Sequence, residues 1–580
     1  MTNTTLTGAE AFLDAFDSFN VRAIFASPGS EQPPIWEALA KRRAEGNEMP
    51  QYVNCRHELL AVSAAWTYGH LTESLPVVIV HTSQGLLNGS MAIRGAYRSK
   101  EPMVIIAGGS STFGEGKFDP GGQWLGGLAD EKSPSHVAAP FVKWIGEIHS
   151  PETLEGTLRQ ACRVALAPPM GPAFVFVPYE FLIENITTKS WGKFRSSFAT
   201  SPDHKLVMEV AKLIRDSKKP LIITESAGHS SKTFKLLVEL TETFAIPVVE
   251  AQTPDYANFP RNHPLHQGFD AEPLLKDSDL ILLINVESPW HPPSKWPSKD
   301  ARVVLLDDDP VKSRMPYFDY KIDLIVSGSL ENTFQELINA AKQDPAGIQK
   351  SVSYRLAMNE KLHNKSREAL DAKAQTYSSQ KPMNSNWVAY ILGKVIPDDA
   401  LVIEEAVSNR AFVNRYLSRS LPLSLFSADV GGLGTGFGFA LGAKLALKDR
   451  LIVAIMGDGA FNYSPVTPGL GFVQEYKTPF LLVLLNNGGY AAQYRHVVKL
   501  FPDGYNANAG MIYGPRIVPS PNYTKLAEAF DGFGIRVEEP SQLESALKLG
   551  IQKVKNGQMA VVDVMMEVCG ASNWKTTLTH

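Results

Sequence analysis

The sequence predicts an α/β protein made of three doubly wound domains, each with a parallel sheet covered by helices. Its 580 residues are too many for one domain of ordinary size. Short apolar segments alternate with helical stretches along most of the chain, which is the α/β pattern. Many of these segments are apolar at every position, as suits strands that are buried on both faces.

The first block covers residues 1–190. Its clearest strands are expected at Val77–Val80 and Met103–Ala107, and a helix at Glu58–His70. The block closes near Pro172–Phe181, and the polar stretch that follows predicts a linker.

The second and third blocks cover residues 200–345 and 385–580, and a polar linker helix is expected between them at 346–384. Strands of the second block are expected at Pro220–Thr224, Ile246–Glu250, Leu280–Ile284 and Val303–Leu306. Strands of the third block are expected at Leu401–Glu404, Leu451–Met456, Phe480–Leu485 and Ala560–Val564.

Composition excludes several classes of protein. With 56 Lys and Arg against 60 Asp and Glu, the net charge is −4, so we expect no nucleic-acid partner. The three cysteines form no C-x-x-C pair, which excludes a disulfide scaffold. The apolar runs are too short to span a bilayer, and the first residues show no signal-peptide pattern, so we expect a cytoplasmic protein without a membrane partner.

Two motifs of the third block point to a metal–phosphate site. Gly457-Asp458-Gly459 follows one apolar strand, and Asn486-Asn487-Gly488-Gly489-Tyr490 follows the next. Two strands joined by one helix lie parallel, so both motifs open on the same edge of the sheet, where such sheets bind ligands. Either motif alone would also fit a simple turn, but the pair at this spacing favours a cofactor site.

The residue types of the two motifs suit Mg²⁺. Asp458 offers a carboxylate oxygen, Asn487 an amide oxygen and Gly489 a backbone carbonyl. Such hard oxygens are the ligands that Mg²⁺ prefers, with water and phosphate completing its octahedron. Gly457 and Gly459 leave room for backbone N–H groups to approach phosphates at a helix N-terminus.

GDG followed by 26 residues and then NN resembles the diphosphate motif of thiamin diphosphate enzymes. The resemblance covers almost the whole chain and implies pyrimidine-binding, central and diphosphate-binding domains in that order. It implies thiamin diphosphate and Mg²⁺ as cofactors. FAD, which some relatives hold in the central domain, is not expected because LIITESAGHSS lacks a run of glycines, although it stays open.

The resemblance also assigns further cofactor residues. Glu58 matches the acid that bonds to the aminopyrimidine ring and activates the cofactor, although a first-turn Glu is also favoured by the helix dipole. Leu433 matches the residue that props the cofactor into its bent shape, or is a core leucine. The other positions implied to line the cofactor are Asn88, Ser408, Ala460, Phe461, Asn462, Tyr463 and Tyr490.

Three polar residues resemble the serine and two histidines of benzoylformate decarboxylases. Ser30, His81 and His291 each follow an expected strand. The resemblance implies that Ser30 holds the substrate carboxylate and that the histidines relay protons, for which a pKa near neutrality is suitable. A histidine at the end of a strand is also often structural, so that reading stays open for His81 and His291.

Other features differ from that family. The segment 494–520 is longer than the family shows and is expected to be a lid or to shape the substrate pocket together with Ala492 and Gln493. SPGSEQPP and RGAYRSKEP resemble acetohydroxyacid synthases. His81-Thr82-Ser83-Gln84-Gly85 stands where those enzymes have Thr-Ser-Gly-Pro-Gly, which argues against a standard synthase.

The resemblance implies a lyase that decarboxylates a 2-oxo acid through an enamine intermediate, with carboligase capacity. An acetolactate-synthase-like carboligase and a cofactor-binding, non-catalytic subunit remain the alternatives. Because such enzymes hold the cofactor between the first domain of one subunit and the third domain of another, a homodimer or homotetramer is implied. The substrate side chain, the acceptor and the stereochemistry are not specified by the sequence.

Overall fold

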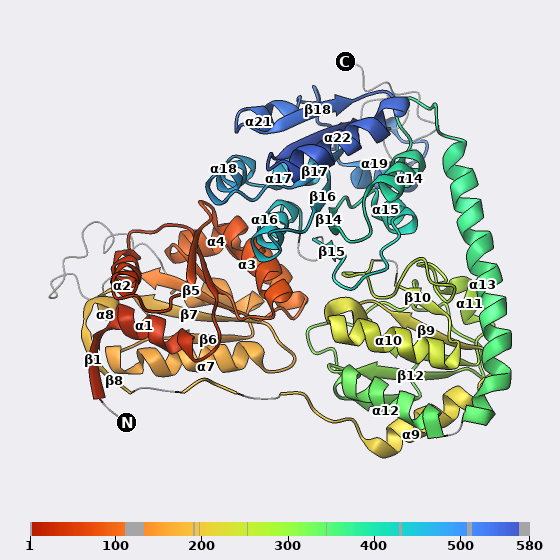
Figure 1. Ribbon diagram of the computed structural model, residues 1–580, viewed down its shortest axis with the longest axis horizontal. Helices are drawn as coiled ribbons and strands as arrows, with labels where there is room; N and C mark the ends of the chain where they lie inside the picture. The colour runs from red at the N-terminus through yellow and green to blue at the C-terminus, as the bar shows by residue number, and fades with distance from the viewer. Residues whose placement is uncertain are drawn as a thin grey trace. The chain divides into compact units, whose positions relative to one another are not determined.

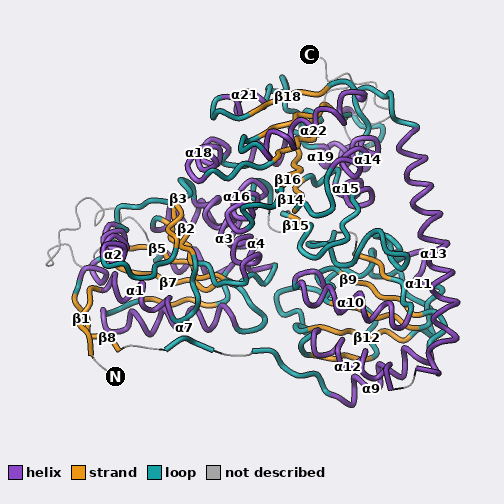
Figure 2. The backbone as a smooth tube through the Cα atoms, viewed as in Figure 1, coloured by secondary structure: helices purple, strands orange, loops and turns teal. Residues whose placement is uncertain are grey.

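The structure is a computed structural model in which strands and helices alternate along the chain (Figure 2). It describes residues 3–110, 133–189, 192–195, 198–251, 253–343, 345–428, 432–506 and 513–567. The chain forms two units. The first contains residues 1–198, 429–449 and 462–479, and the second contains residues 199–428, 450–461 and 480–580.

The sheet of the first unit has six parallel strands in the order β3-β2-β4-β5-β7-β6. Its strands are β2 (Ala23–Ala26), β3 (Gln51–Asn54), β4 (Val77–Val80), β5 (Met103–Gly109), β6 (Trp144–Glu147) and β7 (Pro172–Pro178). The order reverses between β2 and β4, so the loops after these two strands flank the crevice where doubly wound sheets bind ligands.

Helices cover both faces of this sheet (Figure 1). One apolar layer joins α1, α2 and α7 to the strands, and α3 and α4 contact the opposite face. The helices of this part are α1 (Gly8–Asp17), α2 (Pro33–Ala44), α3 (Glu58–Thr72), α4 (Thr82–Arg98), α6 (Pro134–Ala138), α7 (Leu154–Leu166) and α8 (Glu180–Ile183).

Helix α16 (Gly436–Ala446) packs closely on α3 within the first unit. A Cβ atom at Gly442 would lie 2.1 Å from the carbonyl oxygen of Ala64. The Trp66 and Phe439 rings meet edge to face at 4.6 Å. This contact fixes the helix that begins with Glu58.

The second unit contains a five-stranded parallel sheet in the order β10-β9-β11-β12-β13. Helices α9, α10 and α12 cover one face, as Figure 1 also shows. The elements of this part are α9 (His204–Asp216), β9 (Pro220–Thr224), α10 (Ser231–Phe244), β10 (Val248–Glu250), α11 (Glu272–Leu275), β11 (Leu280–Ile284), β12 (Arg302–Asp307), β13 (Leu324–Ser327), α12 (Leu330–Gln343) and α13 (Pro345–Gln375).

The remaining sheet has the order β15-β14-β16-β17-β19-β18, the same topology as the sheet of the first unit. Its reversal lies between β14 and β16. The strands are β14 (Leu401–Glu405), β15 (Leu425–Ser427), β16 (Ile452–Gly457), β17 (Leu481–Asn486), β18 (Phe533–Val537) and β19 (Ala560–Met565). The other helices are α14 (Ser385–Val395), α15 (Arg410–Tyr416), α17 (Asp458–Tyr463), α18 (Val466–Tyr476), α19 (Ala491–Leu500), α21 (Thr524–Glu528) and α22 (Leu543–Lys555).

The predicted fold class is confirmed, because three parallel sheets are flanked by helices. The strand expected at Ile246–Glu250 begins only at Val248, since Pro247 has no N–H to donate to a neighbouring strand. The linker expected after the first block is wrong at Asn185–Lys189. These residues form β8, which pairs antiparallel with β1 (Asn3–Thr7).

Among the described residues, no helix is long and apolar enough to cross a membrane.

Candidate active site

Asp458 and Asn487 follow adjacent parallel strands, and their oxygen atoms converge on one backbone N–H. Asp458 begins α17 directly after β16, and Asn487 follows β17. The N–H of Gly489 donates to Asp458 Oδ2 at 3.0 Å and to Asn487 Oδ1 at 3.2 Å. The three residues named as metal ligands therefore lie together in the second unit.

The electrostatics of Asp458 suit a cation. Burial raises the pKa of Asp458 to about 7, and the groups that oppose this shift are backbone N–H groups of Gly459, Gly489, Gly488 and Asn487. A charged carboxylate is therefore costly here unless a positive charge joins it. A carboxylate oxygen beside an amide oxygen is a donor set that fits Mg²⁺.

A buried polar network lies behind this loop. Asn486 donates from Nδ2 to Asp563 Oδ1 at 2.9 Å, and Arg536 Nε donates to Asp563 Oδ2 at 2.9 Å. Asn486 Oδ1 accepts from the N–H of Gly488 and from the Ser520 hydroxyl, both at 3.2 Å. The network orients the loop that carries Asn487. Sequence reasoning missed Asp563, although a charged residue within the apolar strand AVVDVM was a usable signal.

Glycine is required at two positions of the site. A Cβ atom at Gly459 would lie 2.7 Å from Tyr490 Cδ1, and one at Gly489 would lie 2.1 Å from the carbonyl oxygen of Pro515. At Gly457 a Cβ atom would meet no described atom within 4 Å. Gly459 and Gly489 therefore allow Tyr490 and Pro515 to pack closely against the backbone, whereas Gly457 borders open space.

The end of the long segment predicted at 494–520 returns to the same loop. Tyr490 N–H donates to the Pro515 carbonyl at 2.7 Å, and Ile517 N–H donates to the Gly488 carbonyl at 2.9 Å. The segment begins in α19, which includes Ala492 and Gln493. Residues 507–512 lie outside the described residues, so its role as a lid stays a prediction.

The remaining residues named for the diphosphate occupy loops and α17. Ser408 lies in the turn between β14 and α15, and Leu433 in the turn before α16. Four more of these residues lie in α17. Ala460 and Phe461 are buried there, whereas Asn462 and Tyr463 are exposed. Their contact with a cofactor stays a prediction.

Glu58 is a buried carboxylate at the start of α3 in the first unit. It is the first helical residue and is 7% exposed. Asn88 Nδ2, on α4, donates to Glu58 Oε2 at 3.2 Å. A Cβ atom at Gly85 would lie 3.1 Å from Glu58 Oε1, so the absence of a side chain there leaves this oxygen its space. The predicted residues Glu58 and Asn88 are thus brought together.

His81 pairs with a carboxylate that sequence reasoning missed. His81 follows β4, and its Nδ1 lies 2.6 Å from Oε2 of Glu31, which follows β2. The hydrogen bond to Glu31 raises the pKa of His81, with burial opposing it and the charges of Glu31 and Glu58 adding to it. The sequence carries no signal for this pair, because Glu31 and His81 meet only through the neighbouring positions of β2 and β4 in the sheet.

The backbone beside His81 is strained. Thr82 adopts φ 43°, a left-handed conformation that costs a β-branched residue roughly 1–3 kcal/mol. Such strain is concentrated at functional sites and supports a role for this turn. Ser30 lies exposed in the loop after β2, directly before Glu31.

His291 belongs to the second unit. It lies exposed in the loop after β11, as the sequence predicted for its position in the chain. Its participation in a site with Ser30 or His81 stays a prediction.

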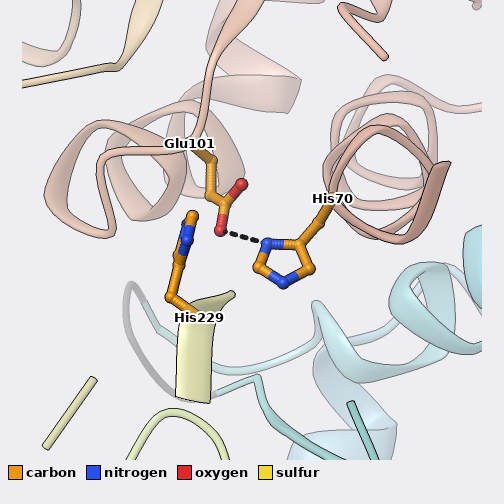
Figure 3. A group of neighbouring side chains, drawn as sticks. All are labelled: His70, Glu101 and His229. Carbon is orange, nitrogen blue, oxygen red and sulfur yellow. Dashed lines mark hydrogen bonds and ion pairs between the residues drawn. The ribbon is translucent and has the colours of Figure 1, made fainter. Parts of the chain in front are cut away.

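A second histidine–carboxylate pair of the first unit was not predicted. His70, near the end of α3, and Glu101, before β5, lie 2.9 Å apart between Nδ1 and Oε1 (Figure 3). Both side chains are almost fully buried. This pair joins α3 to the segment before β5, away from the strand ends that carry Glu31 and His81.

Comparison with protein families identifies all three parts of the chain. Residues 6–131 match the N-terminal TPP binding domain of thiamine pyrophosphate enzymes, residues 207–337 the central domain, and residues 406–564 the C-terminal TPP binding domain. The chain belongs to the thiamine pyrophosphate enzyme family.

Within this family the chain is similar to enzymes of different activities. It is 25% identical to the acetolactate synthase isozyme 3 large subunit of Escherichia coli over 97% of this chain and 95% of that protein. It is 25% identical to the oxalyl-CoA decarboxylase of E. coli over 94% of this chain and 93% of that protein. Family membership is therefore shown, whereas the relatives differ in reaction.

A solved structure agrees with the fold of this family. The thiamine diphosphate-dependent 4-hydroxybenzoylformate decarboxylase of Rhodococcus jostii RHA1 superposes with a TM-score of 0.77 at 22% identity. The match covers 97% of this chain and 99% of that chain. At this identity the similarity establishes the fold alone.

Proposed function

We propose that this protein is a thiamin diphosphate- and Mg²⁺-dependent lyase that decarboxylates a 2-oxo acid and has carboligase capacity. The observation that carries the proposal is the buried Glu58 at the start of α3, whose Oε2 accepts from Asn88 on α4. A buried carboxyl group beside a glycine suits proton exchange with a ligand, because no side chain at Gly85 shields its other oxygen. Membership of the thiamine pyrophosphate enzyme family supports the cofactor.

The residues of the second unit would hold the metal and the diphosphate. Asp458 Oδ and Asn487 Oδ1 would bind Mg²⁺ with the carbonyl of Gly489, and the backbone at Gly457 and Gly459 would approach the phosphates. The convergence of the two side-chain oxygens on the Gly489 N–H supports this assignment. Bound thiamin diphosphate would supply the nucleophilic carbon and the electron sink that C–C cleavage requires.

The residues of the first unit would move protons. Glu58 would hold a proton at Oε1 and share it with the aminopyrimidine ring, while Asn88 keeps the carboxyl group in place. His81 would donate a proton from Nε2, because its Nδ1 is engaged by Glu31. Ser30 and His291 complete the proposed substrate side, binding the carboxylate and relaying a proton.

We also propose a homodimer or homotetramer with the domains 1–190, 200–345 and 385–580. Glu58 belongs to the first unit and Asp458 to the second. A cofactor that needs both residues would be held between the first domain of one subunit and the third domain of another, so neither subunit would be active alone.

The second candidate is an acetolactate-synthase-like carboligase. The 25% identity with an acetolactate synthase over nearly the whole chain favours it. His81, paired with Glu31, favours the lyase, since a proton donor would release the product as an aldehyde before a second carbonyl is captured.

The test is a mass-spectrometric screen of 2-oxo acids with thiamin diphosphate and Mg²⁺, each with and without an aldehyde acceptor. The proposal expects CO₂ and an aldehyde as main products from at least one acid. A hydroxy ketone as main product would move the assignment to a carboligase.

Glu58→Gln is the matched control for this screen. It keeps the shape and the contact with Asn88, so it should bind the cofactor as wild type does but turn over roughly 10²- to 10⁴-fold more slowly, as expected for loss of a general acid–base group. Tight cofactor binding without turnover in both proteins would favour a non-catalytic role.

A further inference from the structure

Glu31 is the most deeply buried charged group near His81. It follows β2 by a few residues, lies just before α2, and is 1% exposed. A Cβ atom at Gly108 would lie 2.0 Å from Glu31 Cγ, and one at Gly29 would lie 2.4 Å from Glu31 Oε1. The chain therefore has two glycines where any side chain would displace this carboxylate.

The contacts of Glu31 favour a cationic partner. Its Oε2 lies 2.6 Å from His81 Nδ1, and its Oε1 has no hydrogen-bond partner among the described residues. Transferring a carboxylate from water to such a place is costly unless it is paired with a positive charge. Within the described part of the chain His81 is the side chain that bonds to Glu31, so a protonated imidazole would balance this charge.

The surroundings of His81 agree with this charge state. Its side chain is 35% exposed, so one edge of the ring is open while Nδ1 is held. The charged groups that act on it are Glu31, from the loop after β2, and Glu58, from α3, and both raise its pKa. Burial of His81 and its position as N-cap of α4 disfavour a positive charge on its ring. The hydrogen bond to the Glu31 carboxylate is the strongest influence and raises the pKa of His81.

We propose that Glu31 is a positioning residue that favours the doubly protonated form of His81, so that the site presents a cationic Nε2–H to the carboxylate of an anionic substrate. The second part rests on the proposed function, which supplies the 2-oxo acid. With Nδ1–H held by Glu31, the tautomer and the ring plane are fixed. Thr82, the next residue, adopts a left-handed backbone conformation with φ 43°.

The charge state is measured without cofactor or turnover, by histidine C2–H/D exchange of the full chain read by peptide mass spectrometry. Wild-type His81 should titrate above 6.5. In Glu31→Gln, which keeps an acceptor of the same shape but removes the charge, the midpoint should fall by about one unit or more. His204, exposed and bonded to Glu336, is the internal reference and should not shift.

Two results would overturn the proposal. One is a wild-type midpoint for His81 at or below 6.5, which needs no variant. The other is an unchanged midpoint in Glu31→Gln when circular dichroism and the melting temperature show a native fold. Glu31→Asp, which keeps the charge on a shorter side chain, should give a midpoint between those of wild type and Glu31→Gln.

Kinetics then separate this inference from the proposed function. If the enzyme decarboxylates a 2-oxo acid, Glu31→Gln should raise KM for the anionic acid and move the alkaline limb of kcat/KM to lower pH, whereas cofactor affinity should not change. If no 2-oxo acid is turned over, the proposed function fails, but the titration of His81 still decides whether Glu31 sets its charge.

Discussion

Glu250 and Asp458 are both buried carboxylates at the C-terminal edge of a parallel sheet, yet their environments are opposite. Burial alone would raise the pKa of Glu250, but Arg261 and His266 overcome it and lower this pKa to about 2. Arg261 Nε donates to Glu250 at 2.9 Å, and Asn258 Nδ2 donates to its other oxygen at 3.2 Å. At Asp458 the opposing groups are backbone N–H groups, and burial raises the pKa to about 7.

The difference separates a carboxylate that is paired within its own chain from one that we propose binds a metal ion. Glu250 is complemented by side chains of its own chain, so its charge stabilises the fold around the central sheet. Backbone N–H groups oppose the rise of the Asp458 pKa, and we propose that a bound Mg²⁺ balances its charge. Burial and position at a sheet edge are alike in the two cases, so the nature of the partner is what distinguishes them.

The largest expected effect concerns stability. Glu250→Gln leaves the buried Arg261 without its counter-charge and should lower the free energy of unfolding by about 3–5 kcal/mol. Urea unfolding at neutral pH measures it. Asp458→Asn is the matched control, and in the apo protein it should not lower stability. Equal losses in the two variants would remove the distinction.

Acid should weaken the wild-type protein through Glu250. Its folded pKa of about 2 lies below the ordinary glutamate pKa of 4.5. Its contribution is therefore complete above about 4.5 and is lost as the pH falls towards 2, amounting to roughly 3 kcal/mol. Urea unfolding between pH 6 and 3 should show wild type losing stability more steeply than Glu250→Gln, and parallel slopes would contradict this.

Asp458→Asn should instead affect ligand binding. Loss of the carboxylate should weaken Mg²⁺-dependent binding of thiamin diphosphate by about 100-fold, since a charge-assisted metal contact becomes a neutral one. Calorimetric titration at saturating Mg²⁺ measures the affinity. An affinity equal to that of wild type would show that Asp458 is not a metal ligand.

The smallest expected effect is at Asp563, behind the metal loop. Asp563→Asn weakens its bonds to Asn486 and Arg536 without touching the proposed ligands, and should reduce cofactor affinity by about tenfold. The same titration measures it. A loss as large as that of Asp458→Asn would place Asp563 in direct contact with the ligand.

The part of the site that could be predicted depends on local pattern. Asp458 and Asn487 each follow an apolar strand, and the parallel pairing of those strands brings them together without further information. Glu58 was predictable from its place at the start of an apolar helix together with the family resemblance.

The missed features depend on contacts that spacing does not encode. Glu31 meets His81 because β2 and β4 are neighbours at the reversal of the sheet, although β3 lies between them in the chain. Strand β8 is polar and became a strand only by pairing with β1, which lies at the other end of the first unit's main segment. In both cases the feature depends on a contact with a distant segment of the chain, which the local sequence does not reveal.

The central claim is tested most directly by calorimetric titration of thiamin diphosphate into the apo protein with and without Mg²⁺. The account predicts saturable binding that requires Mg²⁺ and is retained in Glu250→Gln at temperatures where that variant stays folded. Binding of equal affinity with and without Mg²⁺, or no binding in either case, would contradict it.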